Sequence, residues 1–132
     1  MLAFTVNGKY NPDGPRDCSS SSIAFSMSVE EVPVANVELL LCGGPIPVAR
    51  WVSPGTVGGA EVALEIFSQR PELKAFLLRK HGLVAIGDSL NQAFEFAFDA
   101  EIGMQAYYYA LAIGKPEPLT PEQIAEVHRA YS

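Results

Sequence analysis

Two histidines are the first residues to consider for chemistry, because imidazole is the commonest metal ligand among side chains and titrates near neutral pH. His81 lies between two short apolar runs and precedes Gly82, which permits close approach of a backbone or a ligand. Two interpretations stay open: a metal ligand, or a turn histidine hydrogen-bonded to a carbonyl group. His128 lies near the charged residues Glu126 and Arg129 and is interpreted as an exposed side chain.

Two cysteines and one glutamate complete the candidate residues. Cys42 follows three leucines and is predicted to pack in the core, whereas Cys18, beside Asp17, is a candidate thiolate ligand with no partner at metal-binding spacing. Glu101 falls on the apolar side of a predicted helix, where burial disfavours a charged carboxylate that has no partner. It is a candidate to orient a metal-bound histidine or, alternatively, to form a salt bridge between subunits.

Two short strands and a long helix are predicted to position these side chains. Residues 74–79 (KAFLLR) and 83–86 (LVAI) have strand length, and Lys80-His81-Gly82 between them predicts a tight turn. The helix is predicted to begin at Asp88 or Ser89 and to end at Gly114-Lys115-Pro116. Its buried stripe is expected to repeat every three or four residues, through Leu90, Phe94, Ala97, Glu101, Met104, Tyr108 and Leu111. Tyr107–Tyr109 cover most of the helix circumference, so at least one tyrosine is expected at a surface or an interface.

The first half of the chain is rich in glycine, proline and serine, and its predicted elements are short. Residues 3–6 predict a strand, 23–29 fit a strand or a helix turn, and 34–42 predict a helix closed by Gly43-Gly44. Residues 45–51 predict an edge strand, because Pro47 cannot donate a hydrogen bond to a neighbouring strand. Thr56 is the predicted N-cap of the next helix, and Ser53–Thr56 is a weak candidate for an anion site there, with plain capping as the alternative.

The C-terminal region predicts one more helix and completes the fold-class prediction. Thr120-Pro121-Glu122-Gln123 has the residues of a capping box with proline at the first helical position, and the helix is expected to run to about Tyr131. Strands with interposed helices, followed by two helices, favour an α/β layered sandwich.

Composition limits the function classes. The 132 residues, 48% of them hydrophobic, fit one domain with a real core rather than a disordered chain. Nine Lys+Arg against 15 Asp+Glu give a net charge of −6, so we expect neither a nucleic-acid partner nor a basic membrane-surface helix. With two cysteines, no visible signal peptide and no apolar run near the roughly 20 residues of a membrane span, the chain is expected to be cytoplasmic.

An ordered set of short motifs runs through residues 23–131. In order, these are Gly43-Gly44-x-Ile46-Pro47-Val48-Ala49, Pro54-Gly55-Thr56, Leu77-Leu78-x-x-His81-Gly82-Leu83-Val84-Ala85, Leu90-x-x-Ala93-Phe94, Ala110-Leu111-x-x-Gly114-Lys115-Pro116 and Leu119-x-x-Glu122-x-Ile124. With this set the chain resembles the class II aldolase/adducin family, which includes fuculose-phosphate aldolase, rhamnulose-phosphate aldolase and ribulose-phosphate 4-epimerase.

The resemblance implies a three-layer α/β/α sandwich, a homotetramer with sites between subunits, and a small sugar-phosphate substrate. It also implies zinc or another divalent ion held by three histidines, one of them from the His-Gly-Leu motif, where this chain has His81. Such an ion polarises the carbonyl and hydroxyl oxygens of the substrate while a neighbouring carbon–carbon bond breaks.

The chain also departs from the family pattern. Counting back from Val32-Pro33, the family's His-x-His pair falls on Arg16-Asp17-Cys18, of which arginine cannot be a ligand and cysteine can. The family's histidine-tyrosine pair falls on Asn36-Val37. The phosphate-binding residues and the acidic base of the family's N-terminal portion have no counterpart here, so we expect an N-terminally reduced single domain, 1–132, with residues 1–22 as an atypical leader.

Two functions from different classes remain open. One is a metal-dependent sugar-phosphate aldolase/epimerase-type lyase with a degenerate site, in which His81 and Cys18 hold the metal and Glu101 lies behind them. The other is a non-catalytic, adducin-like domain for oligomerisation or partner binding. The replaced ligands favour the second, because a catalytic zinc uses about three protein ligands and one open position. A shortened piece of a longer gene product is the third interpretation.

Overall fold

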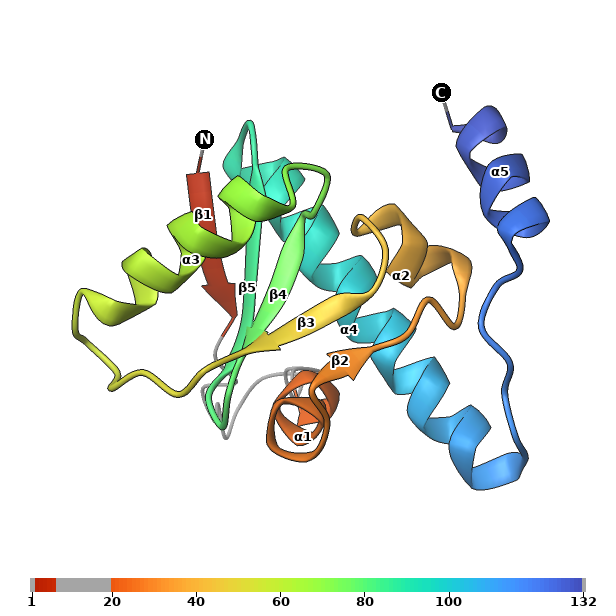
Figure 1. Ribbon diagram of the computed structural model, residues 1–132, viewed down its shortest axis with the longest axis horizontal. Coiled ribbons are helices and arrows are strands. Elements are labelled where there is room, and N and C mark those ends of the chain that lie inside the picture. The colour runs from red at the N-terminus through yellow and green to blue at the C-terminus, as the bar shows by residue number, and fades with distance from the viewer. Residues whose placement is uncertain (1, 7–19, 132) are drawn as a thin grey trace, which may run out of the picture.

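The computed structural model describes residues 2–6 and 20–131 (Figure 1). The elements in chain order are β1 (Leu2–Val6), α1 (Ser20–Ser28), β2 (Glu31–Val32), α2 (Val37–Leu41), β3 (Ile46–Ala49), α3 (Gly58–Gln69), β4 (Ala75–Leu78), β5 (Gly82–Gly87), α4 (Leu90–Ile113) and α5 (Pro121–Ala130). The strand predicted at residues 3–6 and the long helix predicted from Ser89 are therefore confirmed. Residues 23–29, for which a strand or a helix turn fitted, belong to α1.

The five strands form one mixed sheet in the order β1-β5-β4-β3-β2. β4 and β5 are antiparallel neighbours joined by the predicted tight turn, and β1 pairs antiparallel with the outer side of β5. β3 and β4 are parallel, and α3 makes the crossover between them. His81 thus lies in the turn between β4 and β5, at one end of these neighbouring strands, which Figure 1 shows side by side.

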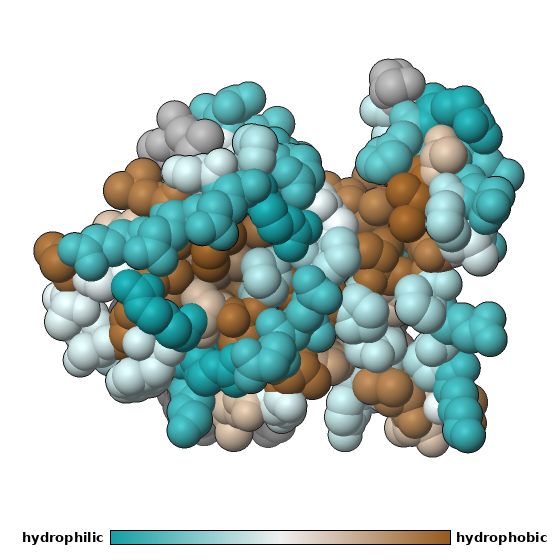
Figure 2. Space-filling view, in the orientation of Figure 1, coloured by the Kyte–Doolittle hydropathy of each residue, from teal (hydrophilic) through white to brown (hydrophobic). Residues whose placement is uncertain are grey.

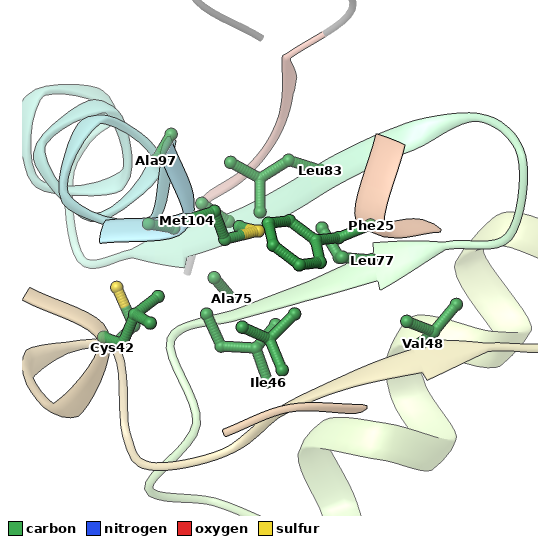
Figure 3. Close-up of a cluster of buried hydrophobic side chains, with 13 residues drawn as sticks. Phe25, Cys42, Ile46, Val48, Ala75, Leu77, Leu83, Ala97 and Met104 are labelled. Carbon is green, nitrogen blue, oxygen red and sulfur yellow. The ribbon is translucent and has the colours of Figure 1, made fainter. Parts of the chain in front are cut away.

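Helices cover both faces of the sheet, which confirms the three-layer α/β/α prediction. Every residue of β4 and β5 is buried, and the side chains alternate between two cores as the twofold period of a strand requires. Ala75 and Leu77 pack with α1, α2 and α4 in the larger core, where Met104 and Phe25 also lie (Figure 3). Phe76 and Leu78 pack with Val62 of α3 in the smaller core.

Side-chain caps define the beginnings of three helices. Asn36 accepts a hydrogen bond from the Leu39 amide at α2, and Ser89 accepts one from the Gln92 amide at α4. At α5 the predicted capping box is present, with both Thr120–Gln123 hydrogen bonds formed. The signals at Ser89 and Thr120 lie within four residues of each helix start, which is why the sequence predicts them correctly. The Asn36 cap was not predicted, because that helix was expected to begin at residue 34 and α2 begins at Val37.

Two local predictions in the first half are wrong. β3 is not an edge strand, because β2 pairs with it at Glu31 and Val32 and forms the edge instead. The Val48 amide donates to the Glu30 carbonyl at 2.9 Å, so this pairing continues past Pro47, which has no amide proton. The N-cap of α3 is Val57, not Thr56, whose hydroxyl instead donates to the Ser53 carbonyl at 2.6 Å.

The predicted buried stripe of α4 is correct only in its middle. Ala97, Glu101 and Met104 are buried, but the other four members, Leu90, Phe94, Tyr108 and Leu111, are each about half exposed. The side of α4 that lies closest to the sheet and to α2 is instead made of small residues. Ala93, Ala97, Ala100 and Gly103 are all buried. Helical spacing therefore identifies residues that share a face, but not the part of that face that the fold covers.

The last helix, α5, stands apart from the sheet and none of its residues is buried (Figure 1). Residues 115–120 lead to it, and the Leu119 amide donates to the Val34 carbonyl at 2.8 Å. Hydrophobic side chains gather where the lobe containing α5 meets the body (Figure 2).

Candidate functional site

His81 occupies a turn that is fixed on several sides. Its amide donates to the Leu78 carbonyl at 3.0 Å, and the preceding Lys80 has a left-handed φ of 58°. The Lys80 amide donates to the Ser26 carbonyl of α1 at 3.3 Å, and the Arg79 guanidinium lies 2.8 Å from the Glu30 carboxylate. The turn predicted at this position is confirmed, and its backbone is held by the neighbouring helix as well as by the two strands.

The His81 side chain lines a recess of about 250 Å³ on the α3 side of the sheet. The loop Ser53–Thr56 and the first turns of α3 form its rim, and Leu78 and Val84 form part of its apolar lining. His81 is the one titratable side chain among the described residues of this lining. The recess can therefore hold a small molecule with a polar end and a short carbon skeleton.

The first turn of α3 lines part of this recess through Gly59 and Ala60. Its N-cap, Val57, makes no side-chain capping hydrogen bond, and Gly59 has open space where a Cβ atom would lie. The first amide groups of a helix attract negative charge when no side chain accepts their hydrogen bonds. The alternative of plain side-chain capping by Thr56 does not apply, because the N-cap of α3 is Val57 and no side-chain capping hydrogen bond is formed there.

Glu101 lies on the other face of the sheet and binds the start of α1. Its side chain is only 7% exposed, and its two carboxylate oxygens accept hydrogen bonds from the Ser21 amide at 3.0 Å and the Ser22 amide at 3.1 Å. Burial raises the pKa of this carboxyl above its ordinary value, and the hydrogen bonds from Ser22 and Ser21 oppose that rise. The structure thus places His81 and Glu101 in different layers and does not bring them together.

The structure describes Cys42 but not Cys18. Cys42 is fully buried in the larger core, as predicted, and its thiol donates to the Phe96 carbonyl at 3.4 Å (Figure 3). Cys18 lies outside the described residues, as do Arg16 and Asp17. Burial, together with the nearby Asp99 charge, raises the pKa of Cys42 to about 12.

We expect Cys42 to be inert toward thiol reagents in the native protein. Only the thiolate reacts at an appreciable rate, and both burial and the raised pKa suppress it. In a Cys18→Ser variant, 5,5′-dithiobis(2-nitrobenzoate) should label no thiol until denaturant is added. Rapid labelling of that variant without denaturant would contradict the buried position of Cys42.

The remaining candidates behave as the sequence predicts. His128 is exposed on α5. Tyr107 is partly buried and stacks on Phe25 with ring centroids 5.7 Å apart, whereas Tyr108 and Tyr109 are each more than half exposed. No sequence pattern indicated a larger groove of about 530 Å³ between α1 and the end of α4, lined mainly by apolar side chains such as Ala24, Val29 and Leu111.

The described residues do not make a complete metal site. Among residues 2–6 and 20–131, no group of three or more His, Cys, Asp or Glu side chains is placed to hold an ion. A catalytic zinc uses about three protein ligands, so the described residues by themselves do not provide a catalytic zinc site. Likewise, no helix within those residues is long and apolar enough to cross a membrane.

Comparison with known proteins identifies the fold that carries this recess. A family model described as the class II aldolase and adducin N-terminal domain matches residues 19–108, more than half of the chain. The chain belongs to the class II aldolase and adducin family. This class II aldolase-type chain is similar to a solved L-fuculose 1-phosphate aldolase, with a TM-score of 0.72 and 22% identity over 85% of this chain and 51% of that one.

Curated relatives include both enzymes and an adducin. The L-fuculose phosphate aldolase of Escherichia coli (strain K12) is 36% identical over 107 residues, which are 79% of this chain and 48% of that protein. Gamma-adducin of Homo sapiens is 28% identical over 94 residues, which are 70% of this chain and 13% of that protein. The class II aldolase-type chain therefore spans about half the length of the aldolase and a smaller part of the adducin.

Proposed function

We propose that this chain carries a reduced class II aldolase-type site, which binds a divalent ion through His81 and Cys18 and accepts a small sugar phosphate. The observation that carries the proposal is the position of His81, which lines the recess beside the loop Ser53–Thr56. Family membership and the similarity to a sugar-phosphate aldolase support the class of substrate.

The chemistry of the recess supports a small phosphorylated polyol. The amide groups at the start of α3 suit an anionic group, because this end of a helix carries partial positive charge. Ser53 and Thr56 add oxygen atoms for hydrogen bonding at the rim. The apolar side chains of Leu78, Val84 and Ala63 suit the carbon skeleton.

The site is reduced because the described residues supply one ligand and no second titratable side chain at the recess. We therefore expect a lyase activity of the aldolase/epimerase type that is far below that of a site with three ligands and a base. Glu101 is kept from direct participation by its hydrogen bonds to α1 and by its place on the opposite face of the sheet.

His81→Ala is expected to abolish binding of zinc, manganese or cobalt, because it removes the ligand proposed at the recess. Equilibrium dialysis of the purified protein against each ion, followed by elemental analysis, measures the effect. The wild-type chain should bind about one ion, as expected for a single site of this kind. Cys18→Ser should weaken binding, and His128→Ala, which removes an exposed histidine far along the chain, is the matched control.

Stoichiometric zinc on the His81→Ala variant would remove the proposed site. The melting temperature of the His81→Ala variant must also be measured. An unchanged value shows that the variant lost a ligand and not its fold.

A second candidate function is a non-catalytic assembly domain, which several large apolar side chains exposed on the described surface favour. We propose a homo-oligomer, and a tetramer is what the family resemblance implies. If the wild-type chain binds no ion even in excess zinc, this second function replaces the first.

A further inference from the structure

The helix α1 is attached near both of its ends to other parts of the molecule. Near its start, the Glu101 carboxylate of α4 accepts hydrogen bonds from the amides of two serines in the first turn, at 3.0 and 3.1 Å. Near its end, the Ser26 carbonyl accepts a hydrogen bond from the amide of Lys80, the residue before His81, at 3.3 Å. The two attachments lie only about 7 Å apart along the helix axis, at 1.5 Å rise per residue. One short helix therefore connects Glu101 with the turn that carries His81 (Figure 1).

Glu101 occupies its buried position at an energetic cost. Its side chain is 7% exposed, and burial raises the pKa of its carboxyl, so the ionised form lowers stability there. Of the elements with most contact to α4, which are α1, α2, β1, β4 and β5, only α2 has a charged residue, Glu38, and its charge acts on Asp99. An apolar residue of similar size would fill this space without that cost. The carboxylate is therefore best explained by what it binds, which is the start of α1.

A carboxylate suits this attachment because of the chemistry of a helix start. The first amides of a helix have no partner within the helix and carry partial positive charge. The helix α1 has no acidic residue in its own first turn, so Glu101 supplies the negative charge from α4. Each of its two oxygens accepts one amide, whereas a neutral amide side chain offers only one oxygen.

The β4–β5 turn depends on α1 for part of its conformation. Lys80 has a φ of 58°, a left-handed conformation that is unfavourable for a residue with a side chain, and its amide is held by α1. Phe25 of α1 belongs to the same buried cluster as Leu77 and Leu83, a cross-strand pair of β4 and β5 next to the turn (Figure 3). A shift of α1 would therefore release the Lys80 amide and disturb the packing next to the turn.

We propose that Glu101 is a positioning residue for His81. Its carboxylate fixes the start of α1, and α1 then holds the β4–β5 turn in the conformation in which His81 lines the recess. Glu101 thus acts on the site from the opposite face of the sheet, without contact with a bound ligand. The role of His81 as a ligand rests on the proposed function, whereas the link from Glu101 to the turn rests on the hydrogen bonds of α1.

Amide hydrogen exchange of a Glu101→Gln variant tests the link. Glutamine fills the same space but has one acceptor oxygen, so one of the two attachments is replaced by an NH₂ group that faces an amide. The Lys80 and His81 amides should then exchange roughly tenfold faster than in the wild-type chain, because a tenfold change is the scale of one lost hydrogen bond. Exchange of these amides reports local opening of the turn.

Gly44→Ala is the matched control for a general loss of stability. It strains the chain after α2, where φ is +108°, and its added Cβ meets only the Arg70 side chain. It should leave the exchange rates of the Lys80 and His81 amides within about twofold of the wild-type rates, because local opening is independent of global stability.

The side chain of His81 gives a readout that a purely structural role of Glu101 would not change. The Cε1 proton resonance of His81 should move in the Glu101→Gln variant and keep its position in the Gly44→Ala variant. Where the wild-type chain binds zinc, the dissociation constant should rise roughly tenfold in Glu101→Gln, as for other residues that orient a metal ligand. Circular dichroism confirms that both variants remain folded.

The outcomes separate this inference from the proposed function. Unchanged Lys80 exchange together with an unmoved His81 resonance in Glu101→Gln would overturn the positioning role, even if the wild-type chain binds zinc. Equal changes in Gly44→Ala would also overturn it, because they would show a general loss of stability. A wild-type chain that binds no ion would overturn the proposed function alone, since the exchange rates and the resonance are measured without metal.

Discussion

Replacement of Glu101 by alanine is expected to lower the free energy of unfolding by about 3 kcal/mol, the scale of losing a buried group that accepts two hydrogen bonds. The Ser21 and Ser22 amides would then face a cavity with no acceptor in the buried start of α1. Urea unfolding followed by circular dichroism measures the loss. Glu126→Ala, an exposed glutamate of α5, is the matched control and should change stability by less than about 0.5 kcal/mol.

The same carboxyl predicts how stability depends on pH. Its pKa is raised in the folded protein, so the folded state takes up a proton at a higher pH than the unfolded state, whose ordinary value is 4.5. As the pH falls from the folded pKa toward 4.5, the Glu101 contribution therefore becomes more favourable to folding. At pH values above the pKa of Glu101 in the folded state, the side chain is ionised, and the full cost of burying its charge lowers the stability of the fold.

Glu101→Gln isolates this effect, because glutamine keeps an acceptor oxygen and does not titrate. The wild-type chain should gain stability relative to Glu101→Gln between pH 7.5 and pH 5. If this stability difference stays constant or falls as the pH is lowered from 7.5 to 5, burial is not the dominant influence on the pKa of the Glu101 carboxyl.

Gly43→Ala is the second substitution with a large expected effect. Gly43 ends α2 with a φ of +106°, and a Cβ atom there would lie 2.4 Å from the Glu72 carbonyl oxygen and 2.6 Å from the Leu73 Cα atom. Both atoms belong to backbone that cannot rotate away as a side chain can. We expect a loss of about 3 kcal/mol or more in the free energy of unfolding, from strain at positive φ together with displaced backbone.

Gly44→Ala separates the two causes. Gly44 has nearly the same φ, +108°, but the nearest atom to its added Cβ is the Arg70 guanidinium at 3.4 Å. It should therefore lose only the roughly 1–2 kcal/mol that a left-handed conformation costs. Thermal unfolding of both variants gives the comparison, and equal losses would exclude the backbone clash as the main cause of the Gly43→Ala loss.

Features encoded in short stretches of chain could be predicted from the sequence. The turn at His81, the capping box at Thr120 and the strands on either side of Gly82 each depend on a few adjacent residues. The layered α/β class followed from the order of predicted strands and helices, and the three layers followed from the family resemblance. Errors arose at β3, where the edge strand that covers Pro47 is only two residues long.

The candidate site was predictable only in part, because its contacts are distant along the chain. Glu101 was correctly placed on the buried side of α4, but its partners lie about 80 residues earlier, in α1. The α4 helix was predicted with nearly its true ends, yet Phe94 and Tyr108 were assigned to the core. Periodicity alone does not reveal that alanines and Gly103 lie closest to the sheet and α2.

The several backbone contacts that hold the β4–β5 turn have a consequence for binding. Because Lys80 is hydrogen-bonded to α1 and Arg79 to β3, His81 is presented without a mobile loop that must first become ordered. A ligand that reaches this histidine therefore incurs little loss of protein conformational entropy on binding. Affinity at the recess then reflects the chemistry of the ligand itself, and a series of small anions and polyols would rank there by their direct contacts.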